Sequence, residues 1–89
     1  MYAIFITNTF EKELQGLGSK ATVARKKLLT HIVPALKQSP YLGANIKKLK
    51  GFSPDTWRYR IGDYRIFYSV EENTKTISLL TISHRREAY

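Results

Sequence analysis

A β-hairpin pattern runs through Trp57-Arg58-Tyr59-Arg60-Ile61-Gly62-Asp63-Tyr64-Arg65-Ile66-Phe67-Tyr68. Two runs rich in aromatic and β-branched residues flank a Gly-Asp pair, and a leading glycine suits the positive φ of a type II′ turn. Such a two-residue turn sets the register of the two strands. The predicted cross-strand pairs are Ile61–Tyr64, Arg60–Arg65, Tyr59–Ile66, Arg58–Phe67 and Trp57–Tyr68.

The two faces of this hairpin differ in chemistry, because side chains alternate along a strand. One face is predicted to lie on the core and carries Trp57, Tyr59, Ile61, Tyr64, Ile66 and Tyr68. The other, called here the arginine face, carries Arg58, Arg60, Arg65 and Phe67. Arginines directly opposite each other cost roughly 0.2–1 kcal/mol relative to a neutral pair. We therefore expect an anionic partner for this face.

Length and composition limit the class of protein. The 89 residues suffice for a single domain, expected over 1–89, with a thin core. Without cysteine the chain has no disulfide, thiolate nucleophile or cysteine zinc site, and two distant histidines do not suggest a metal site. We expect neither metal nor small-molecule cofactor. No apolar run reaches ~18 residues and no leader is evident, so we expect a cytoplasmic protein without membrane contact.

A net charge of +8 favours an acidic partner, above all nucleic acid. The basic residues concentrate around the hairpin and just before it. Lys47, Lys48 and Lys50 are candidates for tracking a nucleic-acid backbone, and Phe67 is a candidate for stacking on a base. A lysine-rich loop is also common for solubility alone.

The remaining periodicities predict an α+β fold, with a small antiparallel-dominated four-stranded sheet in the order β-α-α-β-β-β and two helices on one face. Residues 2–7 are apolar on both sides, which predicts a strand that is covered on both faces or lies centrally in the sheet. Asn8 and Glu11 form a capping box, and the helix that follows should end at Gly18. A second helix is expected to be interrupted at Pro34 and to end before 40. Residues 41–56 are predicted to be mostly loop.

The third strand of the meander, residues 76–83, decides which further residues join the arginine face. A turn over 71–75 would place Thr81 opposite Arg65. Ile77, Leu79 and Arg85 would then share the arginine face, whereas Leu80, Ile82 and His84 would lie on the core face.

Four arginines on one face, at 58, 60, 65 and 85, match a phosphodiester and the extra charge of its transition state. A solvated sheet face is the alternative. The groups able to move a proton are His84, Glu87 and Tyr89, and Tyr89 is also able to stack on a base. RNA carries its own nucleophile, the 2′-hydroxyl, so metal-free RNA cleavage fits, and plain nucleic-acid binding fits nearly as well.

Three segments resemble a known family: Lys47-Lys48-Leu49-Lys50-Gly51, the hairpin itself, and Ile82-Ser83-His84-Arg85-Arg86-Glu87-Ala88-Tyr89. With the order of elements, nearly the whole chain resembles the RelE/ParE superfamily of toxins from type II toxin–antitoxin pairs, and its RelE branch in particular. The resemblance implies a ribosome-dependent endoribonuclease that cuts mRNA in the A site and is neutralised by an antitoxin with an acidic or amphipathic segment.

The resemblance also implies roles for individual residues. Arg58 and Arg60 occupy the positions of two functional lysines, Arg65 and Arg85 match phosphate-contacting arginines, and Tyr89 approximates a terminal-helix tyrosine. Lys47 occupies the position of a glutamate that serves as the general base in the YoeB-like branch. Because arginine hardly deprotonates, the proton acceptor is not assigned to Arg58 or Arg60, and His84 and Glu87 are the two candidates for it. A ParE-like gyrase poison and an inactive basic module that binds nucleic acid or antitoxin are the alternatives.

Overall fold

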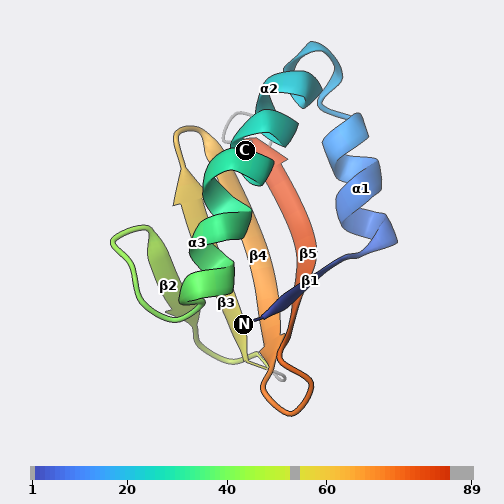
Figure 1. Cartoon of the computed structure of the whole chain (residues 1–89). Coiled ribbons are helices and arrows are strands. Elements are labelled where there is room, and N and C mark those ends of the chain that lie inside the picture. Colours follow the sequence, from blue (N-terminus) through green and yellow to red (C-terminus); the bar gives the residue numbers. More distant parts are fainter. Residues whose placement is uncertain (1, 53–54, 85–89) are drawn as a thin grey trace.

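The computed structural model describes residues 2–52 and 55–84, which form one mixed sheet with helices over one face (Figure 1). The sheet order is β1-β5-β4-β3-β2. The strands are β1 Ala3–Ile6, β2 Ile46–Leu49, β3 Thr56–Ile61, β4 Tyr64–Glu71 and β5 Thr76–His84. The helices are α1 Asn8–Gln15, α2 Ala21–Lys27 and α3 Val33–Gln38, with a 3₁₀ turn at Gly18–Lys20 and a π-helical turn at Leu28–Ile32. The predicted α+β class is confirmed.

The central hairpin, β3 and β4, has the predicted register at every pair from Trp57–Tyr68 to Ile61–Tyr64. Gly62 has a φ of 56°, as the first central residue of a type II′ turn requires. Lys75 is the one non-glycine residue with positive φ among those described, so Asp63 keeps a negative φ and a type I′ turn is excluded. The predicted core face is also confirmed, since its aromatic and aliphatic side chains are buried or pack against the core.

The sheet has five strands rather than the four predicted, because β2 lies in the segment expected to be loop. It pairs antiparallel with β3 and places Lys47 opposite Arg58. As a four-residue edge strand with two adjacent exposed lysines, it has no apolar alternation by which the sequence could reveal it.

The turn between β4 and β5 is one residue shorter than predicted. The expected turn over 71–75 is wrong, since Glu71 pairs with Thr76. The shift places Ile77 and Leu79 on the core face, where both are fully buried, and not on the arginine face. The core therefore gains two aliphatic side chains.

A β-bulge at Leu80 follows in β5 and changes the register again. The predicted pairing of Arg65 with Thr81 is therefore wrong. Beyond the bulge, Ile82 and His84 lie on the core face as predicted, and both are buried.

Strand β1 lies at the edge of the sheet, parallel to β5, so the expected cover on both of its faces is wrong. Phe5 is 58% exposed. Only the first half of β5 is paired with β1, and α1 lies beside the rest of that strand (Figure 1). There Glu13 Oε1 accepts hydrogen bonds from Thr81 Oγ1 at 2.5 Å and from Ile82 N at 3.1 Å, which satisfies part of the open edge.

The N-cap of helix α1 lies one residue earlier than predicted. Thr7, and not Asn8, is the N-cap, since its Oγ1 accepts from Phe10 N at 3.1 Å. The helix ends at its C-cap Gly16 rather than at Gly18. Its apolar side chains Phe10 and Leu14 face the sheet and are fully buried.

The second helical segment runs from α2 through the π-helical turn into α3 and crosses in front of β3 and β4 (Figure 1). Its predicted stripe packs on the sheet, and its fully or nearly fully buried members are Ala24, Leu28, Ile32 and Leu36. The predicted interruption at Pro34 is confirmed by the π-helical turn just before it. None of the described helices has the length and apolar character needed to cross a membrane.

Candidate functional site

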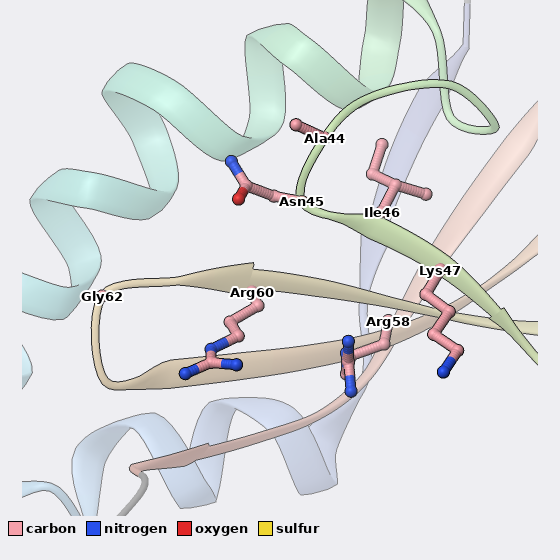
Figure 2. A pocket seen from close by; sticks show the side chains of 7 residues that line it. All are labelled: Ala44, Asn45, Ile46, Lys47, Arg58, Arg60 and Gly62. Carbon is pink, nitrogen blue, oxygen red and sulfur yellow. The ribbon is translucent and has the colours of Figure 1, made fainter.

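A cavity of about 470 Å³, called here the arginine cavity, opens where the start of β2 meets the central hairpin (Figure 2). It is lined by Ala44, Asn45, Ile46, Lys47, Arg58, Arg60 and Gly62. Its backbone wall is fixed, because Arg60 N donates to Asn45 O at 3.0 Å and Ile46 N donates to Gly43 O at 3.1 Å. The cavity is therefore a formed feature of the sheet edge.

Three cationic side chains line this cavity and lie on one side of the β2–β3 pair (Figure 2). Lys47 and Arg58 are directly opposite each other in the register, and Arg60 follows on the same face. Within residues 2–52 and 55–84 none of the three forms an ion pair. The cavity thus concentrates positive charge without internal compensation.

Arg58 has a further unusual feature. Its Nε is buried and has no hydrogen-bond acceptor in the part of the chain described. A buried donor without a partner costs about 1–3 kcal/mol, so such groups are rare. An anionic oxygen bound in the cavity would supply the missing acceptor.

The arginine face continues onto β4 as predicted. Arg65 lies opposite Arg60 and Phe67 lies opposite Arg58, and both are half-buried. The structure therefore brings three predicted arginines together with the predicted stacking aromatic. The pairing of β2 with β3 was not predicted from the sequence. The position of Lys47 opposite Arg58 and the cavity wall around Asn45 therefore became evident only from the structure.

His84 does not join these residues. It lies on the core face opposite Tyr64, is 5% exposed, and contacts the Tyr64 ring edge-on with centroids 5.1 Å apart. Its Nε2 lies 4.0 Å from Asp63 Oδ2. The histidine therefore packs beneath the hairpin turn, on the side of the sheet opposite the arginines.

The other predicted lysines lie outside the cavity. Lys48 points to the opposite face, where its Nζ lies 3.2 Å from Asp55 Oδ2 and 5.9 Å from the Trp57 ring centroid. Lys50 lies in the turn after β2 and is exposed. Of the lysine candidates, Lys47 alone lines the arginine cavity.

The candidates Arg85, Glu87 and Tyr89 lie outside the described residues. Among the residues that are described, no group of three or more His, Asp or Glu side chains is placed to hold a metal ion.

Two comparisons with known proteins, one with family models and one with solved structures, both identify toxins of toxin–antitoxin systems. Residues 4–89 match the family model described as the ParE toxin of type II toxin-antitoxin system, parDE. No curated protein sequence matches the chain.

Solved structures with the same fold include isolated toxins and toxins in complex with antitoxins. The archaeal RelE–RelB complex from Pyrococcus horikoshii OT3 is 30% identical, with 94% of each chain covered and a TM-score of 0.72. The intact Escherichia coli RelBE complex is 26% identical, with 94% of this chain and 96% of that chain covered and a TM-score of 0.73. The RelB–RelE complex from Methanococcus jannaschii is 28% identical, with 96% and 94% covered and a TM-score of 0.67. With a family match over nearly its full length and the fold of RelE toxins, the chain belongs to the ParE toxin family of type II toxin–antitoxin systems, within the RelE/ParE superfamily.

Proposed function

We propose that this toxin is an endoribonuclease that cleaves mRNA in the ribosomal A site. The observation that carries the proposal is the cavity in which Lys47, Arg58 and Arg60 meet without an ion-pair partner among the described residues. Preorganised cations stabilise the charge that develops on phosphorus in phosphoryl transfer. The similarity to RelE toxins at 26–30% identity supports this choice over simple binding.

The reaction uses a nucleophile that RNA itself provides. The 2′-hydroxyl oxygen attacks the adjacent phosphorus while the bond to the 5′-oxygen of the next nucleotide breaks. The products are a 2′,3′-cyclic phosphate and a free 5′-hydroxyl. Arg58, Arg60 and Arg65 would hold the phosphate, and Arg85 is proposed as a fourth contact from the sequence alone.

A base must accept the 2′-hydroxyl proton and an acid must protonate the leaving oxygen. Arginine hardly deprotonates, whereas the ammonium group of a lysine is able to exchange a proton. Lys47 lies in the cavity opposite Arg58, so we assign proton transfer there to Lys47. His84, one of the two candidates from the sequence, lies on the other face and is assigned to packing of the hairpin. Glu87, the other candidate, lies outside the described residues. Tyr89 is proposed to orient the nucleobase.

The proposed partner is an antitoxin, as in the RelE–RelB complexes of similar fold. An acidic or amphipathic segment of the antitoxin would neutralise the arginine face of a protein with net charge +8. We place both proteins in the cytoplasm, where translating ribosomes are found.

Primer extension on mRNA in a translating extract tests the nuclease. Wild-type protein freed of antitoxin should produce discrete cuts, and Arg58→Ala or Arg60→Ala should reduce them at least ~100-fold, as loss of one transition-state donor does. Lys26→Ala, an exposed lysine of α2 on the other side of the sheet, is the matched charge control and should cut normally. Intact messages with the wild-type protein would refute the proposal.

The same assay separates the two candidates for proton transfer. Lys47→Met should lower the cleavage rate without abolishing RNA binding. His84→Gln should mainly lower stability. If His84→Gln removes cleavage at unchanged stability while Lys47→Met cuts normally, the assignment to Lys47 is wrong.

A second candidate is a DNA gyrase poison, favoured by the ParE description of the matching family model. It predicts gyrase-dependent DNA breaks in cells expressing the toxin, with mRNA left intact. Absence of both breaks and cuts would indicate an inactive basic module.

A further inference from the structure

A second cavity, of about 420 Å³, lies at the other end of β2 from the arginine cavity. It is lined by Lys48, Leu49, Lys50, Gly51, Phe52 and Asp55. Phe52 is 55% exposed, so a large apolar ring faces solvent beside this hollow. The mechanism proposed above does not use it.

The charges around this second cavity leave one cation available. Lys48 is engaged by Asp55 at 3.2 Å, so these two charges largely offset each other. Lys50 is exposed and forms no ion pair within the described part of the chain. An aromatic ring and an uncompensated ammonium group therefore both line this cavity.

We propose that this cavity is a subsite for single-stranded RNA, in which a base stacks on Phe52 and a phosphate contacts Lys50. The proposal rests on the proposed ribonuclease function. Proteins that bind single strands combine cations along the backbone path with aromatic rings that accept any base. An acidic peptide would use Lys50 equally well but gains less from an exposed flat ring.

The spacing of the two cavities suits one continuous strand. Lys47 borders the arginine cavity, and Lys50 borders the second cavity three residues further along the chain, in the turn after β2. At about 3.3 Å per residue the separation along the strand is roughly 10 Å. Lys48, which borders the second cavity, points to the face opposite Lys47, so the two cavities lie on opposite sides of the edge strand β2. RNA held at the arginine cavity would pass around this open edge to reach Phe52.

Binding of labelled 2′-O-methyl oligouridines, which cannot be cleaved, tests the subsite by fluorescence anisotropy. One oligonucleotide of ~2 nucleotides, at about 3.4 Å per stacked nucleotide, is too short to extend from the arginine cavity to Phe52, and one of ~8 nucleotides reaches both cavities. Phe52→Leu should weaken binding of the longer RNA roughly tenfold, the lower range for loss of one stacked base, and leave the shorter unchanged. Phe52→Tyr keeps the ring and should bind both as wild type does.

Two further variants sharpen the result. Leu42→Ala removes another exposed apolar side chain, 79% exposed, that lines neither cavity, and should change nothing. Lys50→Gln should reduce the slope of log K against log salt for the longer RNA by about 0.7, the value for one phosphate contact on a single strand.

The outcomes distinguish this subsite from the proposed function. Unchanged binding of the longer RNA to Phe52→Leu overturns the subsite, as does equal weakening of both RNAs. If Phe52→Leu weakens only the complex with antitoxin, the surface is a protein contact and the proposal is wrong. Failure of Arg58→Ala to weaken either RNA would instead count against the arginine cavity and leave the Phe52 result standing.

Discussion

Replacing Arg58 by methionine should make the free toxin more stable while weakening its binding to RNA. The guanidinium of Arg58 has a buried Nε without an acceptor in the described structure, and it lies directly opposite Lys47. Methionine removes both unfavourable features. It keeps an unbranched apolar chain, so most of the packing of the arginine stem against the sheet is retained.

The size of the effect follows from these two terms. Leaving a buried donor unpaired costs about 1–3 kcal/mol. A like-charge pair directly across strands costs about 0.2–1 kcal/mol. Allowing for packing lost with the longer side chain, we expect Arg58→Met to raise the free energy of unfolding by about 1–2 kcal/mol. For a domain of this size each kcal/mol corresponds to a rise in Tm of about 4–8 °C.

Urea unfolding at low salt measures this directly, with an unchanged m-value showing that the compactness of both states is preserved. The matched control is Arg60→Met, which removes an exposed arginine from the same face and should gain less than Arg58→Met. A non-cleavable oligonucleotide should stabilise the wild type more than Arg58→Met. A variant that is less stable than wild type, or no more stable than Arg60→Met, would refute the reasoning that Arg58 is strained by its missing acceptor.

Two further predictions concern the support of the sheet. Glu13→Ala should destabilise the fold by about 1–3 kcal/mol and speed exchange of the Ile82 amide, because the carboxylate accepts from that amide at 3.1 Å; Glu13→Gln, which keeps an acceptor, should lose less. The pKa of Glu72 is lowered to about 2, chiefly by the hydrogen bond from the Lys75 ammonium and then by two tyrosine hydroxyls. A carboxyl group whose pKa is lower in the folded than in the unfolded state stabilises the fold at pH values above the unfolded-state pKa, and this contribution is lost as the pH falls through the folded-state pKa. Between about pH 4.5 and 2, the free energy of unfolding of Glu72→Gln should therefore fall less steeply with decreasing pH than that of wild type.

The sequence predicted the hairpin in full because two independent signals agree there. The Gly-Asp turn fixes the register, and strict alternation of apolar and charged residues fixes the faces. Strand β2 has neither signal, since Lys47 and Lys48 are both exposed at a sheet edge. For this reason the arginines and Lys47 were named from the sequence, whereas the position of Lys47 opposite Arg58 was found only in the structure.

The register of β5 was mispredicted for a related reason. Leu79 and Leu80 are adjacent apolar residues, so parity alone cannot tell which of them faces the core. The bulge between the two halves of the strand resolves this by turning Leu79 and Ile82 to the same face. The sequence shows a run of apolar residues, and only packing against the helices decides where the extra residue is placed.

The core side of the hairpin explains how the fold keeps an unfavourable cluster of cations. Tyr59 lies between Arg58 and Arg60 in sequence and points to the opposite face, where it pairs with the fully buried Ile66. A slip of β3 by one residue would separate the arginines, but it would also move every core side chain of the strand into solvent. Full burial of one such side chain is worth about 1.5–3 kcal/mol, more than the repulsion of one cross-strand arginine pair. The core therefore holds the arginines at fixed spacing in the absence of any ligand, so an anion that bound there would meet a site whose charges are already in place.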